Sequence, residues 1–87
     1  MTTITTMTMT QAITTKYLGP TNCRGSRIVV RSQAGRKIYS WDCELDVADN
    51  HAQAAFLYIK EMGWSGIWAG GALPSKDGYA FVMSARA

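Results

Sequence analysis

The sequence has few of the residues that build covalent or metal-bound sites. Its 87 residues include only two cysteines and one histidine. Cys23 and Cys43 are too few for a disulfide framework, so we expect both to be free thiols in a reducing cytoplasm. Their long, irregular spacing from His51 also does not match that of a zinc site. Nothing in this inventory indicates a metal or a cofactor.

Long apolar runs are missing as well. No stretch approaches the roughly 18 consecutive apolar residues of a membrane-spanning helix. The opening MTTITTMTMT lacks the basic and apolar regions of a secretory signal. We interpret residues 1–10 as a flexible low-complexity leader; a long first strand is the alternative, because Thr and Ile favour strands. Residues 11–87 are then predicted to form a single domain.

A catalytic set is also missing. The glycine-rich GWSGIWAGG lacks the strand-to-helix context and the Lys-Ser/Thr ending of a phosphate-binding loop. A nucleophilic Cys–His pair would need a cysteine beside His51. Cys43 falls on the apolar side of an alternating strand pattern, which favours a small core residue. Cys23 lies among arginines on a loop, where an inert thiol is the simpler interpretation. We therefore predict a protein that is not an enzyme.

The chain does have an uneven distribution of charge. Its net charge is +3, but residues 1–41 hold six basic residues and no acid, whereas residues 42–49 hold four acids and no base. This asymmetry predicts either two segments that pair with each other or a bipolar surface. We interpret the alternating Asp42, Glu44 and Asp46 as the solvated face of a strand rather than a metal site.

Hydrophobic periodicity predicts five strands and one helix. Alternation indicates strands over 11–18, 27–33 and 37–47, a helix follows, and a hairpin from residue 67 ends the chain, with 79–83 as its last strand. Gly70 and Gly71 are expected to bulge or break the fourth strand. The order β-β-β-α-β-β predicts an α+β fold, an antiparallel sheet with the helix packed across one face.

The hairpin between the second and third strands has a predictable register. A two-residue turn at 34–35 places Val30 opposite Tyr39. The same register makes Arg27 and Asp42 a cross-strand ion pair on the other face.

The segment NHAQAAFLYIKEMG has a helix start and stop. Asn50 or Asp49 is the expected N-cap, and Gly63 is the expected left-handed residue after the last turn. Leu57 and Tyr58 fall outside the apolar stripe, where they either pack at its flank or face a partner. The stripe itself is predicted to consist of Ala52, Ala55, Phe56, Ile59 and Met62.

Basic residues 24–37 form the candidate binding region. With Tyr17 and Tyr39 nearby, a basic sheet edge of this kind can follow a phosphate backbone. The alternative is that Arg27 pairs with Asp42 and the other cations solubilise an edge strand. The candidate contact residues are Asn22, Arg24, Ser26 and Arg27, with Arg31, Arg36 and Lys37 as a basic flank. A purely structural loop, in which Asn22 and Ser26 satisfy backbone groups, is equally compatible with the sequence.

Four motifs carry a resemblance to known sequences. QAITTKYLGPTNCRGSRI, NHAQAA, MGWSG and GYAFV together resemble a family of short proteins encoded by phages, plasmids and other mobile elements of bacteria, which has no assigned reaction. The likeness extends over roughly residues 11 to 82. Cys23 departs from the Thr or similar residue usual in that loop, which argues further against a role for this thiol.

The resemblance implies a class of function. Anti-CRISPR and other anti-defence proteins are likewise small and single-domain, and they bind a host defence protein or ribonucleoprotein complex and block it by occlusion. We therefore expect an inhibitor in the cytoplasm of a bacterial host, a monomer or homodimer without membrane contact. The alternative is a small accessory protein that binds nucleic acid through the basic 24–37 hairpin.

Overall fold

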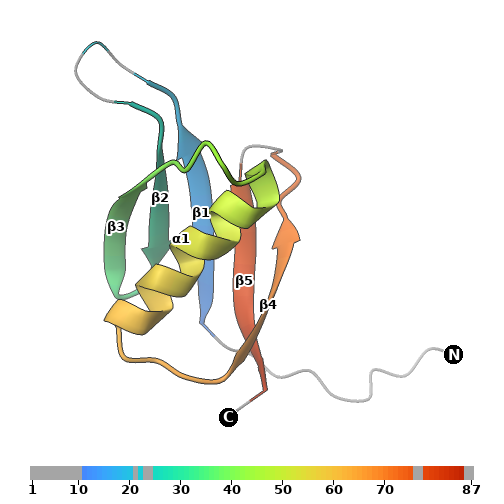
Figure 1. Cartoon of the computed structure of the whole chain (residues 1–87). Coiled ribbons are helices and arrows are strands. Elements are labelled where there is room, and N and C mark those ends of the chain that lie inside the picture. Colours follow the sequence, from blue (N-terminus) through green and yellow to red (C-terminus); the bar gives the residue numbers. More distant parts are fainter. Residues whose placement is uncertain (1–10, 21, 23–24, 76–77, 86–87) are drawn as a thin grey trace, which may run out of the picture.

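The fold is a single antiparallel sheet with one helix on one face. The computed structural model describes residues 11–20, 22, 25–75 and 78–85. The strand order is β3-β2-β1-β5-β4, and α1 crosses the sheet diagonally (Figure 1). The predicted α+β class and element order are confirmed. The elements are β1 (Ala12–Leu18), β2 (Arg27–Ser32), β3 (Gly35–Ser40), α1 (Val47–Glu61), β4 (Ile67–Ala72) and β5 (Gly78–Ala85).

The core lies between α1 and the middle of the sheet. Ile13 of β1 and Ile28 and Val30 of β2 alternate with outward-facing residues and pack against Ala54 and Tyr58 of α1. All five are nearly fully buried. Burial of each large aliphatic side chain is worth about 1.5–3 kcal/mol, so this small set holds the two layers together.

Polar contacts fix the ends of the helix. The Tyr58 hydroxyl donates to the Gly35 carbonyl and shares a hydrogen bond of 2.7 Å with Ser32 Oγ, which ties α1 to the β2–β3 turn. At the other end, the Asp46 carboxylate accepts from the Asp49 amide and caps the helix. After the last turn Gly63 has φ 74°, the left-handed conformation expected from the sequence.

The predicted register of the β2–β3 hairpin is wrong by two residues. Ser32 pairs with Gly35, so the turn is Gln33-Ala34, and Ile28 rather than Val30 lies opposite Tyr39. Both registers keep the same side chains on each face, which is why the alternation alone does not separate them.

The predicted ion pair between Arg27 and Asp42 belongs to that wrong register. Ser40 is the residue opposite Arg27, and Asp42 lies beyond the end of β3. Instead, the Arg27 Nε donates to the Gly25 carbonyl at 3.3 Å. The arginine is therefore not neutralised in the way that the sequence suggested.

The third strand is shorter than predicted. It ends at Ser40, and the sequence from 41 to 46 forms a turn into the helix, which begins at Val47 instead of near Asn50. Cys43 is exposed on this turn and is not a core residue. The Asn50 side chain holds the turn: it accepts from the Asp42 amide and donates to the carbonyls of Asp42 and Leu45. A buried amide that bonds backbone groups thus outcompetes strand alternation here.

The buried stripe of α1 is rotated relative to the prediction. Ala55 is buried and Ile59 and Met62 are partly buried, as expected, but Ala52 is exposed, Phe56 is 57% exposed and Tyr58 is 1% exposed. The earlier helix start and the hydrogen-bonded Tyr58 hydroxyl explain the rotation, since a buried tyrosine needs a partner for its O–H.

The paired glycines do not break β4. Its strand continues to Ala72, with one irregularity in register between Ile67 and Trp68. A Cβ atom on Gly70 would clash with the ring of Phe81 on β5. Gly70 is thus required because the aromatic ring covers it, which is one of the established reasons for glycine within a strand.

Candidate functional site

The face of the sheet turned away from α1, here called the open face, gathers positive charge. Arg31 on β2 lies directly opposite Arg36 on β3, and Lys16 on β1 is opposite Val29. Directly opposed side chains have Cβ atoms only about 5 Å apart, and like charges in such a pair are destabilising. The basic cluster comprises Lys16, Arg27, Arg31 and Arg36.

Among the described strand residues of the open face, none is an acid that could compensate Arg27, Arg31 or Arg36. The other outward positions of the five strands are aliphatic, small or hydroxyl-bearing, such as Thr14, Ile38 and Ala80. Within the described residues, neither Arg31 nor Arg36 has an ion pair. The described strands of the open face therefore form a positively charged surface on which two arginines lie directly opposite each other.

Lys37 does not belong to this cluster. It points to the helix side, where its Nζ lies 2.7 Å from Glu61 Oε2. The ammonium group holds the pKa of Glu61 below its usual range. Burial, with the nearby Glu61 carboxylate, raises the pKa of Tyr39 to about 12. Lys37, Tyr39 and Glu61 are thus a local group on the helix side, next to the core.

The two tyrosines expected beside the arginines also lie on the helix side. Tyr17 stacks edge-on against Trp41, with ring centroids 5.0 Å apart, and its hydroxyl bonds Ser26 Oγ. Tyr39 is next to the core cluster. No described strand residue on the open face is aromatic, so stacking on an aromatic platform is not what this face offers.

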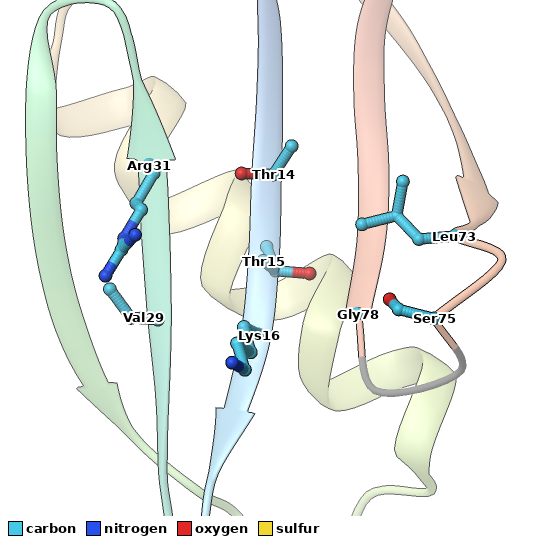
Figure 2. Close-up of a pocket in the computed structure, with 8 residues that line it drawn as sticks. All are labelled: Thr14, Thr15, Lys16, Val29, Arg31, Leu73, Ser75 and Gly78. Carbon is cyan, nitrogen blue, oxygen red and sulfur yellow. The ribbon is translucent and has the colours of Figure 1, made fainter.

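A pocket of about 300 Å³ opens beside the basic cluster and is called the sheet pocket (Figure 2). Its walls come from two adjacent strands, from the β4–β5 turn and from the start of β5. The lining residues are Thr14, Thr15, Lys16, Val29, Arg31, Leu73, Ser75 and Gly78. A Cβ atom on Gly78 would clash with the Thr15 carbonyl oxygen and come within 3.3 Å of Leu73 Cδ1, so this position accepts only glycine.

The candidate loop residues divide into two groups. Ser26 and Arg27 line a second, more open pocket of about 530 Å³ at the end of the sheet, together with Trp41 and Cys43. Ser26 also has structural roles, because its carbonyl accepts from the Trp41 amide. Asn22 is exposed, and Arg24 lies outside the described residues.

The acids lie together at the turn into α1. Asp42 Oδ1 accepts from the Glu44 amide at 2.9 Å, and Asp46 caps the helix. These carboxylates serve as turn and cap acceptors rather than as the wet side of a strand. Among the described residues no group of three potential metal ligands comes together. The described part of the chain thus has a basic open face and an acidic turn.

The single histidine is a core residue. His51 is buried, its Nδ1 lies 2.7 Å from Thr15 Oγ1, and its ring packs at 4.6 Å from that of Tyr79. Cys43, by contrast, is exposed on the turn. His51 therefore fixes the helix to β1.

Comparison with known proteins adds no relative. No family model matches the chain, and neither the curated proteins nor the solved structures give a significant match. The resemblance to mobile-element proteins stays a prediction. Within the described residues we find no helix with the length and apolar character that crossing a bilayer requires.

Sequence reasoning missed part of the site. Lys16 belongs to the basic cluster, and both Lys16 and Thr14 line the sheet pocket, because β1 is the central strand and lies beside β2. The alternation of β1 places both on its polar side, but only the strand order brings them next to Arg31. Ser75, on the β4–β5 turn, and Gly78, at the start of β5, also line the sheet pocket, and no motif in the sequence indicated either residue.

Proposed function

We propose that this protein is a non-catalytic binding protein whose open face binds the phosphate backbone of nucleic acid. The observation that supports this best is the direct opposition of Arg31 and Arg36 on a strand surface without acids. Arginine is suited to phosphate because its planar fork donates two parallel hydrogen bonds. Without aromatic residues on this face, binding is through phosphates and is largely independent of sequence.

The test is the salt dependence of binding to a fluorescein-labelled 20-base-pair duplex, measured by anisotropy. Each neutralised phosphate contributes about −0.9 to the slope of log K against log salt, so full use of Arg27, Arg31 and Arg36 gives about −2.7. A slope near zero, or no binding at low salt, would exclude this function.

Adjacent residues on opposite faces provide a matched control. Arg36→Gln and Lys37→Gln remove the same charge from neighbouring positions of β3. Arg36→Gln is expected to weaken binding and reduce the slope by about one unit, because one phosphate contact is lost. Lys37→Gln should leave the slope unchanged, because Lys37 faces Glu61 on the other side. Equal effects of the two variants would mean that only net charge matters.

The inhibitor expected from the resemblance is the second proposal. A ribonucleoprotein exposes phosphates of its RNA, so the same basic cluster fits an occluding complex with a host defence particle. Capture of one defined ribonucleoprotein that survives nuclease treatment, is lost with Arg36→Gln and is retained with Lys37→Gln would support the inhibitor. Release of all bound material by nuclease would support direct binding of nucleic acid alone.

A further inference from the structure

The sheet pocket is lined by both apolar and polar side chains. Val29 is only 2% exposed although it lies on the open face, and Leu73 covers the other side from the β4–β5 turn. The hydroxyls of Thr14 and Ser75 stand at the rim (Figure 2). Arg31 flanks the opening. An apolar surface with a few polar groups and an adjacent cation suits a ligand that is flat and uncharged on one part and anionic on the next.

A nucleotide combines a flat, uncharged base with an anionic phosphate. We infer that the sheet pocket receives one unstacked nucleoside of a single-stranded nucleic acid, while Arg31 binds an adjoining phosphate; this inference rests on the proposed function. The base or sugar packs against Leu73, and the Thr14 and Ser75 hydroxyls bond its polar edge. A volume of about 300 Å³ is at the lower end of the range for small-molecule sites, which fits one nucleoside rather than two.

The pocket predicts a preference between forms of nucleic acid. In a duplex the bases are paired and stacked, and extracting one costs a few kcal/mol. A single strand presents its bases without that cost. The described open-face strand residues include no aromatic side chain, so the sheet pocket holds a base by shape rather than by stacking. Duplexes therefore meet only the arginines, whereas single strands meet the arginines and the pocket.

The experiment compares a labelled 12-nucleotide single strand with the duplex of the same sequence, by anisotropy at one salt concentration, using the full chain. The wild type is expected to bind the single strand about fivefold more tightly, a difference of about 1 kcal/mol, because only the single strand places a base in the pocket. Ser75→Phe covers the pocket without changing charge and should remove this difference while duplex affinity stays constant. Ser65→Phe makes the same change at an exposed position between α1 and β4 and should leave the difference intact.

A second variant protects the test against misfolding. Thr14→Phe fills the pocket from β1, and phenylalanine is favoured in strands. Loss of the preference in both pocket variants, with unchanged circular dichroism, supports the inference. Equal affinity of wild type for single strand and duplex, or a preference that persists in both variants, overturns the inference and leaves the proposed function standing. Absence of salt-dependent binding to either probe overturns both.

Discussion

The two faces of the sheet are made from the same strands and have opposite properties. Ile28 on the helix side is 1% exposed and packs in the core, whereas Ile38 on the neighbouring strand faces outward and is 43% exposed. The helix side also satisfies its charges, as Lys37 and Glu61 show. The open face keeps like charges opposed. Side chains on the helix side stabilise the fold, whereas the opposed arginines on the open face reduce its stability. Such a loss of stability is expected at a binding surface.

The comparison is tested most strongly by truncating one isoleucine on each face. Ile28→Ala is expected to lower the free energy of unfolding by about 2–5 kcal/mol, because it removes buried methyl groups and leaves a cavity. Ile38→Ala should cost below about 1 kcal/mol, since substitutions at the surface usually stay near 0.5. Urea unfolding followed by circular dichroism measures both. Similar losses for the two variants would mean that the open face is covered in solution.

The turn between the layers is the next test. Asn50→Ala leaves the Asp42 amide and nearby carbonyls without partners and is expected to cost about 2–3 kcal/mol. Gln53→Ala, at an exposed position one turn further along α1, should change stability by no more than about 0.5 kcal/mol. A small loss for Asn50→Ala would show that solvent replaces these hydrogen bonds.

Alkaline pH affects the helix side through Tyr39. Its pKa is raised from 10.0 to about 12, so the folded protein holds this proton more tightly than the unfolded chain. The resulting stability is complete below about pH 10 and is lost as pH rises through 12. The urea midpoint should therefore fall between pH 10 and 12, and fall less in Tyr39→Phe. An equal fall in both proteins would assign the effect to other groups.

The smallest effect is predicted on the open face, and its sign is opposite. Arg36→Gln removes the repulsion with Arg31 and should raise the free energy of unfolding by about 0.2–1 kcal/mol, while it weakens binding to nucleic acid. Lys37→Gln should lower stability slightly, because it removes the partner of Glu61. A loss of stability in Arg36→Gln would contradict the view that this pair is unfavourable in the free protein.

Alternation predicted the faces well and the pairing poorly. Ile13 and Thr15 share the buried side of the strand predicted over 11–18, since a period of two needs only local sequence. The central position of β1 in the sheet depends on its pairing with β5, more than sixty residues away. A local sequence pattern cannot predict such a distant pairing. The same holds for the site: Arg27, Arg31 and Arg36 were predicted from their hairpin, whereas Lys16 required the strand order.

The register error has a related cause. Moving the turn from Ala34-Gly35 to Gln33-Ala34 leaves every residue on the same face, so hydrophobic pattern cannot choose between them. The choice depends on Gly35, which has φ 138° at the first position of β3 and whose carbonyl accepts from Tyr58. A contact from the helix thus decides a detail of the hairpin.

The central place of β1 has a consequence for synthesis on the ribosome. The strand made first pairs on one side with β2, its neighbour in sequence, but on the other side with β5, where Ile13 meets Phe81. Until β5 has left the exit tunnel, one edge of β1 has no partner, and the nascent chain exposes an open row of amides and carbonyls. Because distant pairings form slowly, the last strand decides when the domain closes and stops being prone to association with other chains.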